Sequence, residues 1–344
     1  MPLTTLALPP SRLVEDGRQV VGRFGAPAER NNLIDADYRG WPRALRWWRL
    51  KEWQAVQVAS PRLFANLALF DARLMQLRQV KVYDRDRGVK HVHERKLPPR
   101  ALRIADQLHD SVNRHADRGG ELTFRNRFAC GRIEVEVELA ATADAPRVAG
   151  RFALLCDRGA SQVVSLPFAH GGMYSHKGMF PVEGELTIGD QRVRLDPAEA
   201  LALLDDHKGY YPYVMRWDWV TCATWQGGEA LGFNLTRNQC RDPVHHNENC
   251  AWRGDRLGVL PAVEVSRTRV GQPGERWHFR DREGRVDVTF APTVPGDVHV
   301  QAIVVESRYR GPFGRFTGRL EPAGMAPIVI DGWFGMGEDF HLRC

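Results

Sequence analysis

The stretch from Asp205 to Trp252 concentrates side chains that could do acid–base chemistry. Aspartate, histidine, lysine, arginine and glutamate alternate here with tryptophan and tyrosine. Such a mixture is typical of a partly buried pocket, because burial and neighbouring charges tune the pKa values of groups that transfer protons or fix ligands. The stretch therefore predicts where a site lies, but it does not name the reaction.

A glycine-rich segment upstream, from His170 to Gly178, adds two histidines, a tyrosine and a lysine. Histidine can donate or accept a proton near neutral pH, so His176 is a candidate catalytic residue and Lys177 a candidate ligand-binding cation. The alternative is a surface loop whose histidines are only solvated.

A charged run, Asp206, His207, Lys208 and Gly209, follows the helix that we predict over residues 197–206. Gly209 suits the positive φ of a helix terminus, and the two basic residues suit the negative end of the helix dipole. That structural account needs no function. Asp206 and His207 are nevertheless candidate proton-transfer groups, and Lys208 is a candidate ligand-binding cation.

The strand expected next carries Arg216, Trp217, Asp218 and Trp219. Successive side chains of a strand point to opposite faces, so one face is aromatic and the other is ionic. The sequence does not decide which face lines a cavity. We assign pocket-shaping roles to Tyr211, Trp217 and Trp219, and a charge-holding role to Arg216.

A polar segment between Asn234 and Trp252 contains Glu248, which is a candidate acid or base together with His245. Asn234 and Asn249 are candidate ligand-binding amides. The competing interpretation is a loop in which asparagine and glutamate side chains satisfy backbone groups.

The same segment offers an alternative metal site. Its possible ligands have the donor types of tetrahedral zinc and are Cys240, His245, His246 and Cys250. Their spacing matches no standard zinc finger or ribbon, so we expect no cofactor and keep zinc as the alternative.

Several signatures are absent, which narrows the function classes. The chain has no GxxxxGK[ST] loop, no GxGxxG fingerprint, no GxSxG elbow and no HExxH helix. Common nucleotide-dependent, α/β-hydrolase and zinc-protease chemistries are therefore not expected.

The charge balance argues against a nucleic-acid partner. The chain of 344 residues has 48 basic and 42 acidic side chains, a formal charge of +6. The basic positions are scattered, apart from a cluster between Trp41 and Trp53 in which arginine alternates with tryptophan. That cluster could stack on bases and contact phosphates, but a strand or short helix with tryptophan inside and arginine outside is the favoured interpretation.

The six cysteines form no CxxC pair, which is typical of reduced thiols in a cytoplasmic protein. No secretory signal and no apolar run of membrane-spanning length is evident, so we expect a cytoplasmic protein without an integral membrane segment. Nothing in the sequence indicates the oligomeric state.

The dominant period of the chain is two. Residues 132–139 alternate charged and aliphatic side chains, and residues 80–94 predict a hairpin. Many such short strands predict a mainly β, antiparallel barrel or sandwich with a few short helices. The helix over residues 197–206 is the best divider, so we predict two β halves, 1–196 and 197–344; a second short helix is expected near residues 99–108.

The chain also resembles a family of bacterial proteins known as a domain of unknown function. The residues that carry the resemblance are spread over most of the chain and are densest in its central third: His176-Lys177, Asp206-His207-Lys208-Gly209, Arg216-Trp217-Asp218-Trp219, Gly232 to Thr236, Asn247-Glu248-Asn249 and Gly311 to Gly318. The family looks related to the double-calycin superfamily of carotenoid hydratases and pericyclic cyclases. This resemblance implies two lipocalin-like halves and an apolar small-molecule ligand, but it transfers no catalytic residue.

Two functions follow as hypotheses. The first is an enzyme, a lyase or isomerase, that moves a proton on an isoprenoid- or fatty-type molecule in hydration, dehydration, isomerisation or cyclisation. The second is a non-catalytic carrier or sensor of an apolar ligand, with or without a structural zinc.

Overall fold

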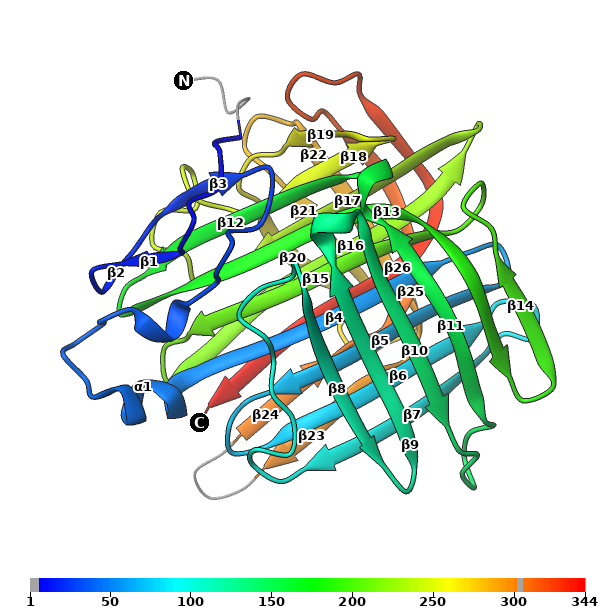
Figure 1. Cartoon of the computed structure of the whole chain (residues 1–344). Coiled ribbons are helices and arrows are strands. Elements are labelled where there is room, and N and C mark those ends of the chain that lie inside the picture. The colour runs from blue at the N-terminus through cyan, green and yellow to red at the C-terminus, as the bar shows by residue number, and fades with distance from the viewer. Residues whose placement is uncertain (1–5, 302–305, 344) are drawn as a thin grey trace. The chain divides into compact units, whose positions relative to one another are not determined.

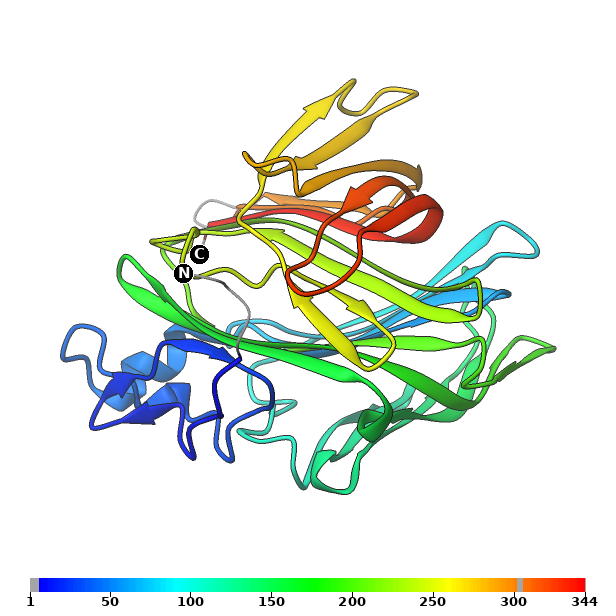
Figure 2. The same cartoon turned by 90° about the horizontal axis from the view of Figure 1, so that it is seen from above.

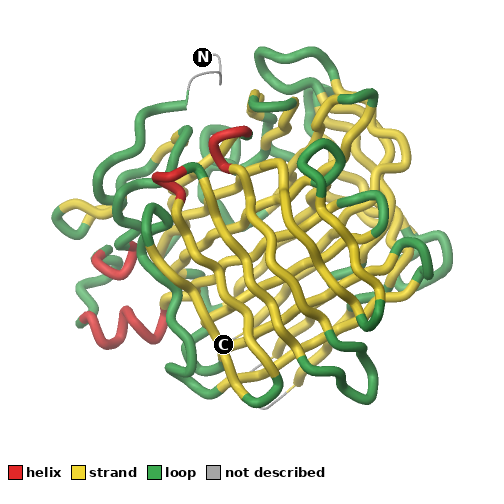
Figure 3. The backbone as a smooth tube through the Cα atoms, turned by 45° about the vertical axis from the view of Figure 1, so that its right-hand side comes forward, coloured by secondary structure: helices red, strands yellow, loops and turns green. Residues whose placement is uncertain are grey.

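The computed structural model describes residues 6–301 and 306–343, and these form mostly β-strands (Figure 1, Figure 3). The chain divides into two compact units. We call Leu8–Ser165 with Met173–Tyr210 the N-terminal unit, and Leu166–Gly172 with the described residues from Tyr211 onward the C-terminal unit. The prediction of a mainly β, antiparallel, two-part chain is confirmed. No helix in the described part of the chain is long and apolar enough to cross a membrane.

The N-terminal unit contains one α-helix, three 3-10 helices and most of the strands of the first half of the chain. They are β1 (Val14–Glu15), β2 (Arg18–Gln19), β3 (Gly22–Phe24), η1 (Leu33–Asp35), α1 (Arg43–Arg49), β4 (Leu50–Ala59), β5 (Leu63–Asp71), β6 (Gln76–Asp84), β7 (Val89–Leu97), β8 (Ser111–Asp117), β9 (Gly120–Arg127), η2 (Phe128–Cys130), β10 (Arg132–Leu139), β11 (Val148–Leu155), η3 (Cys156–Arg158), β12 (Ala160–Phe168), β13 (Gly171–Ile188), β14 (Gln191–Leu195) and β15 (Leu201–Tyr210).

The main sheet of this unit has the strand order β7-β6-β5-β4-β15-β13-β11-β10-β9-β8. The sheet is curled (Figure 2). Side chains show how far the curl goes, because Gln54 of β4 bonds Asn126 of β9 and Asn113 of β8, strands that are far from β4 in the sheet order. The concave face therefore closes around an interior, which the aliphatic cluster of this unit fills.

Alternation builds that interior. In β10, the predicted apolar positions Ile133, Val135, Val137 and Leu139 are buried, and glutamates occupy the positions between them. Burying each aliphatic side chain contributes roughly 1.5–3 kcal/mol. The predicted strand over residues 132–139 and the hairpin of β6 and β7 are both confirmed.

The helix predicted over residues 197–206 is wrong. Asp196 does cap a turn, since its Oδ1 accepts the Ala198 N–H at 3.0 Å, but the turn ends and β15 begins at Leu201. The whole of β15 pairs with β4, from Leu201 opposite Ala59 to the end of the strand, and it is buried on both faces. Pairing and burial outweigh the modest helix propensity of alanine and leucine.

The unit boundary follows from that strand. Because residues 201–210 belong to the sheet of the N-terminal unit, the last passage of the chain into the C-terminal unit lies between Tyr210 and Tyr211. The predicted division at 196/197 rested on a helix that the structure does not contain. The short helix expected near residues 99–108 is also wrong, because that segment is irregular.

The arginine and tryptophan cluster near the N-terminus does form a short helix, α1 (Figure 1). None of the described α1 side chains is buried, and Trp41 and Trp48 are 36% and 40% exposed, so tryptophan does not face inward there as expected. The Trp47 ring instead lies against the guanidinium groups of Arg73 and Arg100, at 5.0 Å and 5.2 Å.

The C-terminal unit is built of strands that form a second antiparallel sheet. They are β16 (Val214–Gln226), β17 (Glu229–Arg237), β18 (Cys250–Arg253), β19 (Arg256–Val259), β20 (Glu264–Thr268), β21 (Arg276–Arg280), β22 (Val286–Val294), β23 (Asp297–Gln301), β24 (Glu306–Arg310), β25 (Phe313–Leu320) and β26 (Ile328–Arg343).

Its strand order is β19-β18-β17-β16-β26-β25-β22-β21-β20, and β24 also pairs with β26. Aromatic residues dominate its core. The Phe316 ring contacts Phe290 at a centroid distance of 4.6 Å and Phe233 at 5.1 Å. Because β17 and β25 are separated by two strands in the sheet order, this contact shows that the second sheet also curls around its own core.

Candidate functional site

The residues nominated from the sequence divide between the two units. His176 and Lys177 lie on β13 and Asp206, His207 and Lys208 on β15, all in the N-terminal unit. The nominated residues of the C-terminal unit are Tyr211, Arg216, Trp217, Trp219, Asn234, Glu248 and Asn249.

Strand β15 presents two different faces. Asp206 and Lys208 follow Ala202 and Leu204 on the face that carries the aliphatic cluster, whereas His207 lies on the opposite face. The charged side chains thus occupy one end of the concave interior. In the helix predicted from the sequence, these side chains would have had different neighbours.

The first part of the site is a buried ionic row across three strands. Lys208 of β15 pairs with Glu52 of β4, which in turn lies opposite Asp71 of β5. Lys208 Nζ lies 2.5 Å from Glu52 Oε1, and Arg73 binds both Glu52 and Asp71, the latter at 2.5 Å. The four side chains are at most 9% exposed, and their two positive and two negative charges balance.

This balance keeps Glu52 ionised. Burial by itself would raise the pKa of Glu52, but the charges of Lys208 and Arg73 outweigh burial and lower the pKa below its ordinary value. Arg73 is fixed further by its backbone, with a φ of 72° and an N–H that donates to Asp71 Oδ1 at 2.8 Å. The row is therefore a rigid ion network.

Asp206 is a further carboxyl beside this balanced network, and it is 1% exposed. Burial raises the pKa of Asp206 to about 7, the charges of Asp205 and Glu52 add to the increase, and Lys208 only partly opposes it. A buried carboxyl with no cation of its own takes up a proton, since the charged form is costly in a low-dielectric interior. Asp206 can therefore both donate and accept a proton near neutral pH.

The hydroxyl of Tyr174 faces this carboxyl. Tyr174 is fully buried and interacts with Asp206 and with Asn31; burial first, and then the Asp206 charge, raises its pKa well above the ordinary value. Tyr174 Oη, Asp206 Oδ1 and Asn31 Oδ1 each lack a partner at full hydrogen-bonding geometry among the described residues. Buried polar atoms without partners are costly, so three that face one another are suited to the polar group of a ligand.

The apolar side of the site begins directly beyond Asp206. Leu204 precedes it on the same face of β15, and Val56 lies opposite Leu204 on β4. Both belong to the aliphatic cluster. Asp206 thus lies at the border between an ionic network and an apolar interior.

An amide network closes the polar end of the interior. Gln54 of β4, opposite Asp206, donates to Asn126 Oδ1 at 2.7 Å and accepts from Asn113 Nδ2 at 2.6 Å. Sequence reasoning missed Gln54, Glu52 and Arg73, and it noted Tyr174 only as the tyrosine of the segment from His170 to Gly178. Polar residues at alternate positions of the otherwise apolar strand β4 are the signal that points to the first two.

The two histidines are less suited to acid catalysis. His176 Nε2 lies 2.8 Å from Ser161 Oγ, and burial, then the charge of Lys177, lowers the pKa of His176 to about 3. His207 stacks on Trp53 at a centroid distance of 3.8 Å, and burial lowers its pKa well below the ordinary value. Both imidazoles are neutral at pH 7, so neither can act as a general acid at that pH.

Lys177 has a structural partner on the same face as His207. Its Nζ lies 2.6 Å from Asp205 Oδ1, and Trp53 Nε1 donates to Asp205 Oδ2 at 3.2 Å. The predicted ligand-binding role of Lys177 stays a prediction, since this ion pair already accounts for its burial.

In the C-terminal unit, the nominated amides hold a loop. Asn234 accepts from Trp219 Nε1 at 2.6 Å and donates to the Glu248 carbonyl at 2.9 Å. Asn249 accepts the Thr236 N–H at 2.7 Å. The bonds to the Glu248 carbonyl and from the Thr236 N–H agree with the interpretation in which polar side chains satisfy backbone groups.

The four zinc candidates do not converge. No group of three or more histidine, cysteine, aspartate or glutamate side chains in the described ranges is arranged to hold a metal ion. His245 is exposed and pairs with Asp242 at 2.8 Å, whereas Cys250 is buried in β18 opposite Asn234. The structure therefore gives no support to the zinc alternative.

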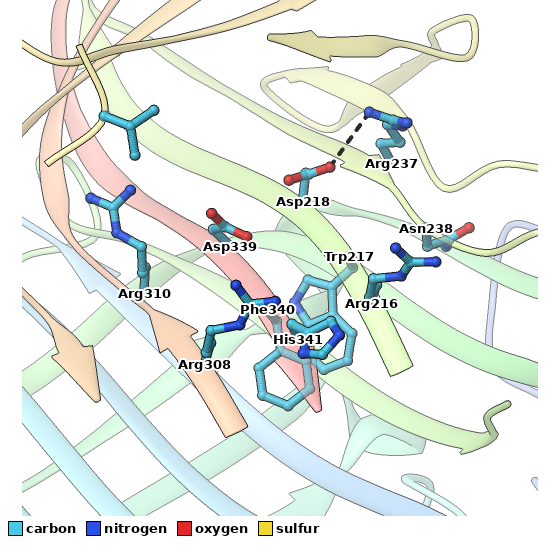
Figure 4. Close-up of a pocket in the computed structure, with 11 residues that line it drawn as sticks. Arg216, Trp217, Asp218, Arg237, Asn238, Arg308, Arg310, Asp339, Phe340 and His341 are labelled. Atoms are coloured by element: carbon cyan, nitrogen blue, oxygen red, sulfur yellow. Dashed lines mark ion pairs between the residues drawn. The ribbon is translucent and has the colours of Figure 1, made fainter. Parts of the chain in front are cut away.

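Arg216 and Trp217 do line a pocket within the C-terminal unit, with a volume of about 580 Å³ (Figure 4). The Tyr211 ring lies 5.9 Å from that of Trp217. Trp219 is buried, and its indole N–H donates a hydrogen bond to Asn234 Oδ1. The aromatic and ionic groups predicted for this strand are thus both present, and the pocket uses only part of them.

Comparison with known proteins identifies the family. A family model described as "Domain of unknown function (DUF2804)" matches residues 13–344, so the chain belongs to that family, as its central motifs predicted. A search of the curated proteins finds no match. Among the solved structures that are similar to this chain is kievitone hydratase from Nectria haematococca, with 12% identity, coverage of 85% of this chain and 88% of that one, and a TM-score of 0.42.

Proposed function

We propose that this protein is an enzyme that transfers a proton to or from a lipophilic small molecule, with Asp206 as the acid and base. The observation that carries this proposal is the position of the Asp206 carboxyl. It is buried beside the Tyr174 hydroxyl, at the border between the ionic row and the aliphatic cluster. Acid–base catalysis is most efficient when the pKa of the group lies near the working pH, and that of Asp206 is about 7.

The chemistry is proton transfer to an unsaturated carbon. The protonated Asp206 carboxyl adds its proton to a C=C bond, which leaves a carboxylate on the enzyme and a cationic centre on the substrate. Attack of water, with return of the extra proton to the Asp206 carboxylate, completes a hydration. Transfer of a proton from another carbon to the same carboxylate completes an isomerisation. Attack of a second C=C bond forms a ring and a new cationic carbon, and loss of a neighbouring proton to the Asp206 carboxylate then completes a cyclisation. Dehydration is the reverse of the first reaction.

The surroundings favour this cycle in both directions. The charge of Lys208 opposes the rise in the pKa of Asp206, so it stabilises the carboxylate that proton transfer leaves behind. Leu204 and Val56 offer apolar contact on the same face, which supports a lipophilic substrate of the isoprenoid or fatty type. Tyr174 is placed to orient a substrate oxygen or a water.

A deuterium experiment tests the proposal. Purified protein is incubated in D₂O with the total lipid extract of the cells that produce it, and the lipids are compared by mass spectrometry with those from heat-denatured protein. Because the proton on Asp206 exchanges with solvent, turned-over lipids gain deuterium. The variant Asp206→Asn should abolish this gain. The control Asp190→Asn makes the same change at a side chain that is 91% exposed, and it should leave the gain intact.

The opposite results have clear meanings. Deuterated lipids that form equally with Asp206→Asn would refute the role of Asp206. An apolar ligand that binds and is recovered with unchanged mass would favour the non-catalytic carrier instead. The five described cysteines are free, which agrees with reduced thiols; cytoplasmic location remains part of the proposal, and cell fractionation checks it.

A further inference from the structure

A row of basic side chains crosses three neighbouring strands of the C-terminal unit. Arg216 of β16 lies opposite His341 of β26, and His341 lies opposite Arg308 of β24. Residues directly opposite one another in antiparallel strands point to the same face, with Cβ atoms roughly 4.5–5.5 Å apart. We call these three residues the basic row; Figure 4 shows them together at one end of the pocket.

The next row on the same face carries the acidic groups. Asp218, Asp339 and Arg310 lie opposite one another, two residues along each strand. Arg267 binds Asp218 at 2.5 Å and approaches Asp339 at 3.6 Å. This second row has its own counter-charges.

Arg310 also forms an ion pair with Glu275. Its two terminal nitrogens bind the two carboxylate oxygens of Glu275 at 2.8 Å and 2.9 Å. This bidentate pair holds the Arg310 guanidinium in one orientation. The second row therefore forms a fixed wall beside the basic row.

The pocket as a whole is positive. Four arginines and two aspartates line it, an excess of two positive charges before His341 is counted: Arg216, Arg237, Arg308 and Arg310 against Asp218 and Asp339. Adding Arg267 and Glu275, which pair with lining residues, leaves that excess unchanged. A bound anion offsets this excess of positive charge.

An aromatic layer supports the basic row. Trp217 and Phe340 stack at a centroid distance of 4.0 Å with an interplanar angle of 17°, and Trp217 Nε1 donates to Glu338 Oε2 at 3.0 Å. These two rings occupy the positions adjacent to Arg216 and His341 and also line the pocket. Rigid rings at this place fix the strands that carry the guanidinium groups.

We infer that this pocket binds a small organic oxyanion, a carboxylate or a phosphate ester, through the basic row. A guanidinium presents a planar fork of N–H donors that matches the two oxygens of either group. A volume of about 580 Å³ is suited to a molecule of metabolite size. This site lies in a different unit from Asp206 and is independent of the proposed proton transfer.

The test is calorimetric titration of the whole protein with two probes, pyrophosphate and citrate, at constant ionic strength maintained with potassium chloride. We expect saturable binding of at least one probe, and binding at least about tenfold weaker in Arg216→Gln and in Arg308→Gln, because each variant loses charge-assisted hydrogen bonds. Arg282→Gln is the matched control. It removes the same charge from an exposed turn of the same unit, and it should bind like the unaltered protein.

The two probes also identify the ligand class. Binding of pyrophosphate alone supports a phosphate ester, binding of citrate alone supports a carboxylate, and binding of both supports a general oxyanion site. In each case the ring resonances of His341 should shift on titration. The inference would be overturned if neither probe binds, or if binding is undiminished in both Arg216→Gln and Arg308→Gln. Circular dichroism of each variant checks that the fold is retained.

Discussion

The unusual protonation of Asp206 makes a quantitative prediction about stability and pH. Asp206 has a pKa of about 7 in the folded protein, against an ordinary value of 3.8. A carboxyl whose folded pKa is raised destabilises the protein once it must ionise. The protonated Asp206 makes its full contribution to the free energy of unfolding below the ordinary pKa of 3.8, and that contribution is lost as the pH rises through about 7.

The difference between the two pKa values sets the size of the effect. The difference of about 3 between the two pKa values corresponds to about 4 kcal/mol in total. Of this, about 2–3 kcal/mol is lost between about pH 5 and pH 8, because ionisation in the unfolded chain already begins below pH 5. Asparagine cannot ionise, so Asp206→Asn should gain about 2–3 kcal/mol of stability relative to the unaltered protein over this interval.

Urea unfolding of the two proteins at several pH values between 5 and 8 measures this difference. Every other titrating group is common to both proteins, so its contribution cancels in the comparison. Asp190→Asn, at an exposed position, should show no such trend. A difference between Asp206→Asn and the unaltered protein that stays constant with pH would refute the reasoning. Such a constant difference would show that Asp206 is a carboxylate in both the folded and the unfolded protein throughout this interval.

Three further predictions concern the same cluster and the metal alternative. Glu52→Gln should lower the free energy of unfolding by about 3–5 kcal/mol, since it leaves the buried Lys208 charge without its partner; Glu121→Gln, in a more exposed ion pair, should cost less than about 1 kcal/mol in the same urea titration. Tyr174→Phe should raise the pKa of Asp206 further, because the tyrosine hydroxyl lowers it; the infrared carbonyl band of the protonated carboxyl, followed against pH, reports this. A zinc chelator should leave the melting temperature unchanged, and a clear fall in that temperature together with stoichiometric zinc by mass spectrometry would contradict the ligand geometry.

Local patterns in the sequence were reliable where one strand face is buried and the other is solvated. The alternation over residues 132–139 predicts β10 correctly, because the period of two is a direct consequence of strand geometry. The same reasoning fails for residues 201–210. That strand is buried on both faces, so its apolar run lacks alternation, and the preceding Asp-Pro turn imitates the start of a helix.

The candidate site shows the same division. Asp206 and Lys208 could be selected from the sequence because they are titratable groups in an otherwise apolar segment. Their partners Glu52 and Arg73 could not, since antiparallel pairing of β15 with β4 joins residues that are far apart in the chain. Glu52 then decides whether Lys208 is a structural or a ligand-binding charge.

By itself, the sequence determined the β class, the family and the residue types available for acid–base chemistry, because each of these depends on composition and on neighbours within a few positions. Only the tertiary structure decided which of these groups titrates near neutrality. The pKa of Asp206 depends on burial and on charges from β4, and the basic row depends on the register of β16, β24 and β26. Register and burial arise from contacts between distant segments, so local patterns do not contain them.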